Sequence, residues 1–476
     1  MATKREKRDP YILEALISIL GLIFFISLAI LRYKADPHVP ILLGVFVAAV
    51  VGLRAGFSWK EIETGMLNGI TNSLQAIVIL AIIGILIGVW ILSGVVPTLL
   101  YYGLKILHPS IFLPATLIIC SITSLATGTS WGTAGTIGIA LIGIGGGLGF
   151  PLPVVAGAVL SGAYFGDKMS PLSDTTNMAP AMVGTDLYTH IKHMSYTTGV
   201  SYGITLVIEI VLSFFYGGGQ ANLEKVNQIM TGIDAQFSVN PLLLIPPVII
   251  IALAFRKIPA VPGIVIGIIT AGILGVIFQG NTFGSLLSAA YGGYASSSGV
   301  EAVDNLLTKG GFESMMYTVS LVICAMMFGG IMEKTNQVRV VVSVILKKAQ
   351  STGSLITATI LTAIGANLIL CEQYMAIVMT SKMYAQSYKD RGLHPKNLSR
   401  AVEDSATVTA NLVPWNSGGA YMAATLGVAT IAYLPFTFFC WISPIVSMLY
   451  GWFNITIAPL EEKVESPDVV AENGSA

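Results

Sequence analysis

The sequence contains few charged residues: Asp, Glu, Lys and Arg together make up only 11% of its 476 residues. In soluble domains about a quarter of the residues are charged. The shortage of charge accompanies 54% hydrophobic residues and a mean hydropathy of +0.77. A water-soluble globular fold is therefore excluded. The composition predicts an all-α polytopic membrane protein, because helices satisfy their backbone hydrogen bonds inside the bilayer.

Net charge and cysteine are also scarce. The 25 basic residues balance the 25 acidic ones, so no long-range field favours nucleic acid as a partner. The four cysteines, Cys120, Cys324, Cys371 and Cys440, lie far apart in apolar segments, without the spacing of a disulfide framework or a zinc site. We therefore predict no cofactor and no transition metal.

Long apolar runs predict where the chain crosses the membrane. The basic start 1-MATKREKRDP-10 precedes 11-YILEALISILGLIFFISLAIL-31, which is long enough to span and has no small-residue cleavage site. This run predicts a first transmembrane helix and not a removed signal peptide. Further spans are predicted at roughly 37–54, 72–95, 198–216, 239–255, 260–279, 313–333 and 428–452.

Two pairs of segments differ from these spans because they are short, interrupted and polar near the middle. The segments 111–149 and 354–387 each predict a re-entrant helical hairpin. The segments 152–182 and 398–427 each predict a discontinuous transmembrane helix, broken near Pro171 and Pro414. Such breaks are tolerated in a bilayer only where protein or a water-filled cavity receives the freed backbone groups.

The order of these features repeats along the chain. Ser73 and Ser314, like Gly88 and Gly329, stand 241 positions apart. Each half is predicted to cross the membrane five times, so the second copy would be inverted. We predict a first repeat at 11–217 and an inverted second repeat at 239–455. An extracytoplasmic loop at 218–238 would join the repeats, and the cytoplasmic tails would be 1–10 and 456–476.

The distribution of Lys and Arg tests this threading. It places 19 of these residues on the inner side and 5 on the outer side, with Lys168 inside the membrane. The positive-inside rule therefore predicts that both termini are cytoplasmic. Inverted repeats with one broken helix each are typical of secondary transporters, whose binding site lies where the breaks meet. The sequence thus predicts a transporter and not an enzyme.

The stretch 166-GDKMSPLSDTTN-177 carries three charges at the end of an apolar run. A charge inside the membrane costs at least ~2.5–3.5 kcal/mol and needs a partner or a function. Gly166 and Pro171 release backbone groups there, and the side chains add oxygen atoms, which suit hard cations such as Na⁺. We predict that Na⁺ and H⁺ compete for one carboxylate, with Asp174 as the first candidate.

The second break and the two hairpin tips have similar chemistry, so the four polar elements are expected to converge. The predicted ion-binding residues are Asp174, Thr129, Ser130, Ser173, Thr175, Asn177, Glu372, Asn367, Asp404, Ser405, Asn416 and Ser417. Four more charged residues are candidates for an auxiliary or structural role: Asp167, Lys168, Glu403 and Glu209.

Several alternatives remain open for these residues. Asp167 and Lys168 could form an ion pair at the membrane edge, and Asp174 could only cap a helix. Glu403 could lie on the cytoplasmic rim beside Arg400, together with Asp404. Glu209 could relay protons or pair with a hidden donor. The histidines, including those of 190-HIKH-193, are expected in or near loops, in contact with solvent.

The stretches 166-GDKMSPLSDTTNMAP-180 and 398-LSRAVEDSATVTANLVPWNSGGAYMA-423 resemble signature segments of the NhaC family of Na⁺/H⁺ antiporters. The tips 127-TGTSWGTAGTIG-138 and 371-CEQY-374 are similar to that family as well. The resemblance covers roughly residues 10 to 455. It implies a homodimer in the bacterial cytoplasmic membrane that exchanges Na⁺, or Li⁺, for H⁺ by an elevator-like movement.

Two other functions are compatible with the pattern. Some proteins of that family exchange malate and lactate together with Na⁺ and H⁺, so an Na⁺-coupled organic acid exchanger is the main alternative. The abundance of acidic over basic side chains near the breaks favours a site for cations alone. The third reading is an intramembrane aspartyl protease, because 164-YFGD-167 resembles a Gly-Asp catalytic motif. The second half of the chain has no counterpart of this motif, which argues against a protease.

Overall fold

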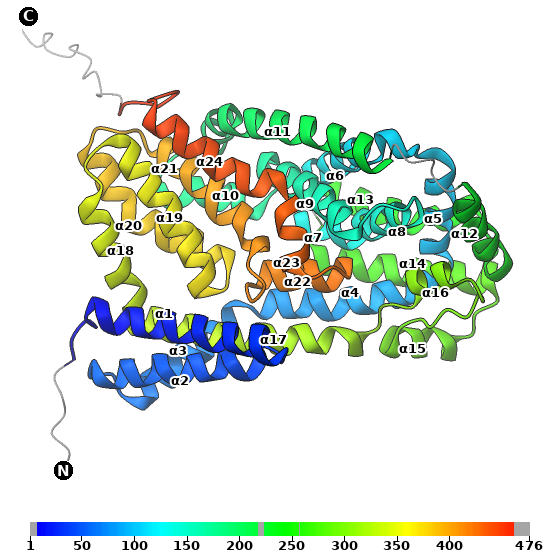
Figure 1. Cartoon of the computed structure of the whole chain (residues 1–476), viewed down its shortest axis with the longest axis horizontal. Helices are drawn as coiled ribbons and strands as arrows, with labels where there is room; N and C mark the ends of the chain where they lie inside the picture. The colour runs from blue at the N-terminus through cyan, green and yellow to red at the C-terminus, as the bar shows by residue number, and fades with distance from the viewer. Residues whose placement is uncertain (1–6, 218–222, 257, 461–476) are drawn as a thin grey trace, which may run out of the picture.

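The protein is a bundle of helices. The computed structural model describes residues 7–217, 223–256 and 258–460, and most of these lie in helices. Figure 1 shows an elongated molecule in which α4 (Leu74–Leu92), α17 (Phe312–Lys334) and α11 (Leu187–Gly217) run along its length. Within the described ranges there is no β-strand beyond two isolated bridges. The predicted all-α fold is confirmed.

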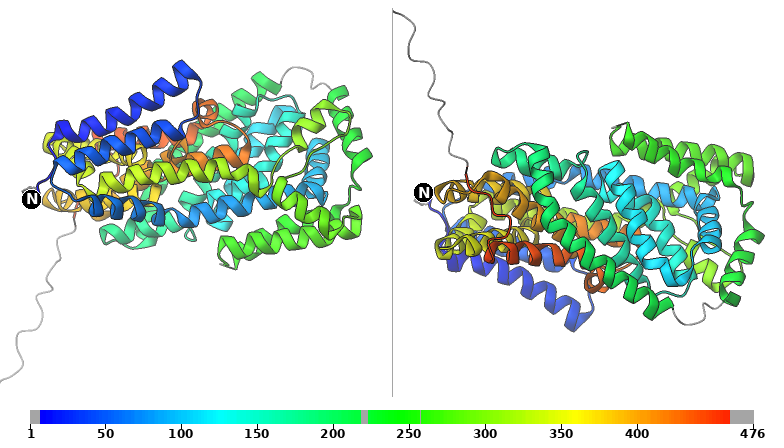
Figure 2. Two further views of the ribbon diagram at one scale, coloured as in Figure 1. Left: turned by 90° about the horizontal axis from the view of Figure 1, so that it is seen from below. Right: turned by 90° about the horizontal axis from the view of Figure 1, so that it is seen from above.

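The helices of the first half follow one another without long connections. They are α1 (Ile12–Ser27), η1 (Leu28–Tyr33), α2 (His38–Arg54), α3 (Trp59–Asn72), α4, α5 (Val95–Ile106), η2 (Pro109–Ile111), α6 (Phe112–Thr127), α7 (Ser130–Thr133), η3 (Ala134–Gly138), α8 (Ile139–Gly147), α9 (Leu152–Met169), α10 (Asp174–Val183) and α11. Figure 2 shows α1 and α2 side by side at the outside of the bundle.

The second half contains shorter pieces between its long helices. They are α12 (Leu223–Gln236), η4 (Pro241–Leu244), α13 (Ile245–Phe255), α14 (Ala260–Gln279), α15 (Phe283–Gly292), α16 (Glu301–Leu307), α17, α18 (Gln337–Lys348), α19 (Thr352–Leu370), α20 (Gln373–Asp390), α21 (Pro395–Val402), η5 (Glu403–Thr407), η6 (Ala410–Leu412), α22 (Ser417–Leu426), α23 (Thr430–Tyr433), η7 (Leu434–Phe436) and α24 (Phe438–Trp452).

Six of the described helices are long and apolar enough to cross a membrane, and two sharply bent helix pairs raise the number to eight. These helices expose apolar side chains on their outer faces, for example Ile122, Val207 and Phe215. Large apolar side chains on the outside are stable in lipid, because the bilayer core is as apolar as they are. The chain is therefore a multi-pass membrane protein.

Both predicted hairpins are helix–turn–helix units. The first turns at Gly128, whose φ of +70° suits glycine, and Thr129 then accepts a hydrogen bond from the Gly132 amide at 3.1 Å. The second turns at Cys371 and Glu372, where the carboxylate accepts hydrogen bonds from the amides of Tyr374 and Met375. In both hairpins a polar side chain at the turn satisfies the freed amides of the returning helix.

Both predicted broken helices are also interrupted. The first stops at Met169 and resumes at Asp174, and Ser170–Ser173 form the break. The second passes through η5 and η6 before α22 begins at Ser417. The predicted repeat boundaries and the inversion of the second half stay predictions, as do the loop at 218–238 and the tails at 1–10 and 456–476. Residues 1–6, 218–222 and 461–476 of those segments lie outside the described residues.

Two expectations about helix extent were wrong. The span predicted at 428–452 is not one helix: the segment at Thr430–Phe436 is bent by 89° from α22, and α24 starts only at Phe438. The span predicted at 198–216 begins earlier, at Leu187, so His190 and His193 lie in α11 and are buried. The polar residues of 190-HIKH-193 predicted a loop. They form a turn of α11 instead, and packing against α21 buries one face of that turn.

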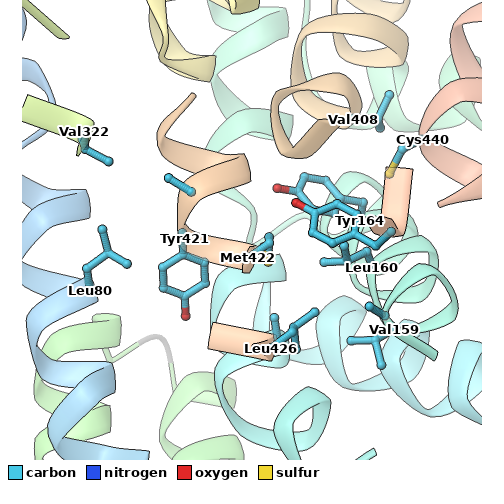
Figure 3. Packing of buried hydrophobic residues seen from close by; sticks show 14 of the residues in the cluster. Leu80, Val159, Leu160, Tyr164, Val322, Val408, Tyr421, Met422, Leu426 and Cys440 are labelled. Carbon is cyan, nitrogen blue, oxygen red and sulfur yellow. The ribbon is translucent and has the colours of Figure 1, made fainter. Parts of the chain in front are cut away.

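The core joins the two halves through α22. Figure 3 shows Tyr421, Met422 and Leu426 between Leu80 of α4 on one side and Val159 of α9 on the other. All five side chains are buried. Since α22 follows the second break, this packing places the break in the interior of the molecule.

Candidate functional site

The tip of the first hairpin meets the end of α9. The amide and the hydroxyl of Ser130 both donate to one carboxylate oxygen of Asp167, at 3.1 and 2.7 Å. The contact depends on a close approach of α6 to α9, because a Cβ atom at Gly166 would lie 2.3 Å from the carbonyl oxygen of Ser121. Asp167 is only 6% exposed. A carboxylate is thus held inside the protein by a loop that the sequence places 37 residues earlier.

The break between α9 and α10 is folded around its own polar groups. Thr176 donates to the carbonyl oxygen of Lys168 at 3.0 Å, and the hydroxyls of Ser173 and Thr175 lie 3.1 Å apart. The amide group of Asn177 donates to the carbonyl oxygen of Ser173 at 2.7 Å. Ser173, Thr175 and Thr176 are buried, whereas Asn177 is exposed.

Asp174 occupies a different environment from the one predicted for the main ligand. It is the first residue of α10 and is exposed. Its charge acts on Asp167 and, together with Asp167 and Glu372, on the hydroxyl of Tyr374, so the three carboxylates lie near one another. Asp174 therefore lies beside the buried carboxylates of Asp167 and Glu372 but is itself exposed.

The second hairpin tip docks onto the second break in a comparable way. Asn416 donates to the backbone oxygen of Asn367 at 3.0 Å, and Asn367 donates to Thr409 at 3.0 Å. The amide of Ser417 donates to the carbonyl oxygen of Cys371 at 2.9 Å, and its hydroxyl lies 3.5 Å from Glu372. These predicted residues are buried and in mutual contact.

A buried ion pair links the two broken helices. Lys168 of α9 donates to Asp404 of η5, and both side chains are fully buried. The other carboxylate oxygen of Asp404 accepts a hydrogen bond from Thr197 of α11 at 2.8 Å. The alternative of an Asp167–Lys168 pair at the membrane edge was wrong, because adjacent helical residues point about 100° apart and reach different partners. The predicted ligand Ser405 donates its hydroxyl to the carbonyl oxygen of Ala401 at 2.6 Å, so this hydrogen bond is made within its own helical segment.

Glu403 is also buried, and among the described residues its carboxylate has no hydrogen-bond partner of normal geometry. It lies close to Lys168, Thr175 and Asp167. The alternative that Glu403 and Asp404 lie on an exposed cytoplasmic rim was wrong for both residues, because both are buried and η5 packs against α19, α20 and α24.

Thr129 lies on the other side of the first hairpin tip from Asp167. It lines a small cavity, about 40 Å³, together with Thr127 and Thr136 of the hairpin and isoleucines of α4, α13 and α14. Thr129 and Ser130 therefore face different surroundings, although they are neighbours in the sequence.

Three further residues at the site were not among the predicted site residues. Thr197 holds Asp404 from α11, and Trp131 stacks on Tyr421 of the other half with the ring centres 4.1 Å apart. Arg400 is 1% exposed, and its Nε and Nη2 atoms have no partner within the described ranges. The one available signal was for Thr197, which begins a series of hydroxyl residues spaced four apart in the sequence.

Comparison with known proteins shows the family to which the chain belongs. The profile described as the Na⁺/H⁺ antiporter family matches residues 7–163 and 162–455. A malate-2H⁺/Na⁺-lactate antiporter of Bacillus subtilis is 42% identical, with 94% of this chain and 96% of that protein covered. NhaC Na⁺/H⁺ antiporters of Alkalihalophilus pseudofirmus and Bacillus subtilis are 39% and 38% identical. These alignments cover 93% and 94% of this chain, and 95% and 99% of the relatives. The chain therefore belongs to the Na⁺/H⁺ antiporter family.

Proposed function

We propose that the protein exchanges Na⁺ for H⁺ across the membrane, and that the ions bind where the first hairpin tip meets the break after α9. The observation that carries this proposal is the buried carboxylate of Asp167, which Ser130 holds by two hydrogen bonds. A buried carboxylate in a membrane protein is stable either with a bound cation or with a proton. Na⁺ and H⁺ therefore compete for it, and one ion displaces the other.

The proposed site consists of residues from both hairpins and both breaks. The carboxylate of Asp167 is surrounded by Ser130, Ser173 and Thr175. Asp174 attracts cations at the exposed edge of the site. Glu372, Asn367, Asn416 and Ser417 hold the second hairpin against the second break. Asp404, Lys168 and Ser405 connect the two broken helices. Thr129 shapes the other side of the tip, Asn177 closes the turn before α10, and Glu403 is a second buried acid near Asp167.

The decisive experiment measures proton efflux from proteoliposomes after addition of external Na⁺, without any organic acid, for the wild type, Asp167→Asn and Asp174→Asn. We expect Na⁺-driven proton movement in the wild type and its loss in Asp167→Asn. Asp174→Asn should retain the flux with a raised KM for Na⁺, because this residue attracts the ion from the exposed edge. Loss of flux in Asp174→Asn with retention in Asp167→Asn would move the site to Asp174.

A second candidate function is Na⁺-coupled exchange of an organic acid. Buried Arg400 has one partnered nitrogen, Nη1, which donates to Thr456 at 2.8 Å, while Nε and Nη2 have no partner among the described residues. A guanidinium edge of this kind matches a carboxylate. Proton movement that appears only with malate or lactate, and that Arg400→Gln abolishes, would favour this candidate.

We propose further that the chain lies in a bacterial cytoplasmic membrane with both termini in the cytoplasm. The excess of Lys and Arg on the predicted inner side supports this orientation, and Figure 1 shows the beginning of α1 and the end of α24 at the same end of the molecule. Labelling of single cysteines placed at Ser58 and at Asn240 tests it, because only the latter should react from outside. The homodimer is proposed from the family resemblance, and the mass of the detergent-solubilised protein by light scattering tests it.

A further inference from the structure

Helix α11 is polar on the side that faces the protein and apolar on the side that faces outward. From residue 195 to 216 its buried residues are Thr197, Thr198, Ser201, Thr205, Glu209 and Ser213. The exposed side chains include Val200, Ile204, Val207, Val211, Phe214 and Phe215. Helix contacts in a membrane protein commonly bury small residues, including serine and threonine, but a buried acid without a partner is rare. The polar face of α11 therefore needs an explanation of its own.

Five of the buried residues are spaced four apart, and the series begins at the central ion pair. Thr197 donates to Asp404 at 2.8 Å, Ser201 to the carbonyl oxygen of Thr197, and Thr205 to the carbonyl oxygen of Ser201. At the far end Ser213 donates to the carbonyl oxygen of Pro109 at 3.0 Å. Ser201 and Thr205 donate to their own helix, and each hydroxyl oxygen can still accept a hydrogen bond, so the series provides polar positions along one face of α11 between Asp404 and Glu209.

Glu209 is the only acid in this series. It is fully buried, and neither carboxylate oxygen has a hydrogen-bond partner in the part of the chain that the structure describes. An unpaired charge in such a place would be very costly, so the group rests as the neutral acid. A purely structural position would be filled more cheaply by glutamine or leucine.

The charged neighbours of α11 all lie toward its other end. Helices α6 and α24 pack along α11 and contain no charged residue; their titratable side chains are Cys120, Cys440 and Tyr450. The charged or titratable residues of the other packed elements are Tyr164, Asp167 and Lys168 of α9, Asp174 of α10, Lys396 and Arg400 of α21, and Glu403 and Asp404 of η5. The contacts of Asp404 with Thr197 and of Ser399 with His190 place η5 and α21 beside the first half of α11.

We propose that Glu209 is a proton-binding site separate from the Na⁺ site, and that the polar face of α11 connects it to the Lys168–Asp404 pair. Thr197 and Glu209 are twelve residues apart, about 18 Å along the helix. A proton taken up at the end of α11 remote from the pair thus reaches the central acids, including Asp167, where it competes with Na⁺. This inference rests on the proposed function, because it deepens the proton half of that exchange.

The test compares two fluxes in proteoliposomes for the wild type, Glu209→Gln, Glu209→Asp and the control Glu313→Gln. Glu313 is an exposed glutamate in the first turn of α17, so the control makes the same chemical change away from α11. One assay measures Na⁺-driven proton movement, and the other measures exchange of ²²Na⁺ for unlabelled Na⁺ without a pH gradient.

We expect Glu209→Gln to lower proton movement at least about tenfold while Na⁺/Na⁺ exchange stays close to the wild-type rate. Glu209→Asp should recover part of the proton movement, and the control should retain both fluxes. Unchanged proton movement in Glu209→Gln would overturn the inference, and so would equal loss of both fluxes, which indicates a structural role. A wild type without Na⁺-driven proton movement would instead refute the proposed function and the inference together.

Discussion

At the scale of single residues, the pair of Lys168 and Asp404 is the one fully buried salt bridge among the described residues. Both side chains are fully buried, and Thr197 satisfies the second carboxylate oxygen. The desolvation of two buried charges offsets much of their attraction, but removal of one partner leaves the other charge unpaired. The pair therefore constrains the two breaks to stay together more than it adds to net stability.

The first prediction concerns this pair. Lys168→Met and Asp404→Asn should each lower the free energy of unfolding by about 3–5 kcal/mol, because each leaves one buried charge without a partner. The double variant should lose less than the sum of the two single losses. Thermal unfolding in detergent, followed by intrinsic fluorescence, measures all three variants. Additive losses would show that the two residues are not coupled.

The second prediction concerns the hairpin tip. Ser130→Ala removes the 2.7 Å hydroxyl contact with Asp167 but leaves the amide contact at 3.1 Å. A hydrogen bond to a charged group contributes about 1.5–3 kcal/mol, so the KM for Na⁺ should rise roughly tenfold or more. Ser110→Ala, at a half-buried position in η2 before α6, serves as the control. An unchanged KM in Ser130→Ala would remove the hairpin tip from the ion site.

At the scale of elements, the site depends on how closely α6 and α9 approach. Glycines on α9 make this possible: a Cβ atom at Gly162 or Gly166 would lie 2.3 Å from a carbonyl oxygen of α6. Close helix contacts through small residues are a common device of membrane proteins. The glycines therefore set the distance between the hairpin tip and Asp167.

The third prediction follows from this contact. Gly166→Ala should push α9 away from α6 and lower the unfolding free energy by about 1–3 kcal/mol, with a loss of transport larger than the loss of folded protein. Gly203→Ala on α11, where a Cβ atom meets nothing within 4 Å, is the matched control. Folded yield and Na⁺-driven proton flux are measured side by side. Wild-type flux in Gly166→Ala would show that the separation of the helices is not critical.

At the scale of the whole molecule, the two halves meet through the first hairpin tip and α22. Trp131 stacks on Tyr421 with an interplanar angle of 13°, and the Tyr421 hydroxyl donates to the carbonyl oxygen of Trp131 at 2.8 Å. The same helix α22 packs against α4 and α17 (Figure 3). A movement of one half against the other must therefore carry this contact along or break it.

The fourth prediction separates the two parts of that contact. Tyr421→Phe loses only the hydrogen bond and should lower the unfolding free energy by about 1 kcal/mol. Tyr421→Ala also loses the stacked ring and leaves a cavity, so its loss should be about 3–5 kcal/mol. Thermal unfolding of both variants and of the wild type gives the comparison. Equal losses would mean that the stacked ring contributes nothing between the halves.

The sequence predicted the architecture better than the site. The first hairpin and both breaks lie where glycine or proline interrupts an apolar run, because these residues favour turns and end helices. The second hairpin turns at Cys371 and the acidic Glu372. The span at 428–452 was predicted wrongly because Pro435, which lies in the short helical turn before Phe438, was not read as an interruption of the apolar run. The histidines of 190-HIKH-193 were predicted wrongly because their burial depends on a helix that comes two hundred residues later.

Composition and local pattern determined that this chain is an all-α membrane protein, where its helices turn and break, and which polar residues gather at the breaks. Each of those properties follows from the preference of a short segment for lipid, water or a particular backbone conformation. Only the tertiary structure decided the partners: Lys168 pairs with Asp404, 236 positions away, and Asp167 is held by Ser130 while Asp174 remains exposed. The physical reason is that a buried charge is stabilised by whichever group the folded chain brings beside it, and a side chain's neighbours in sequence do not specify that group.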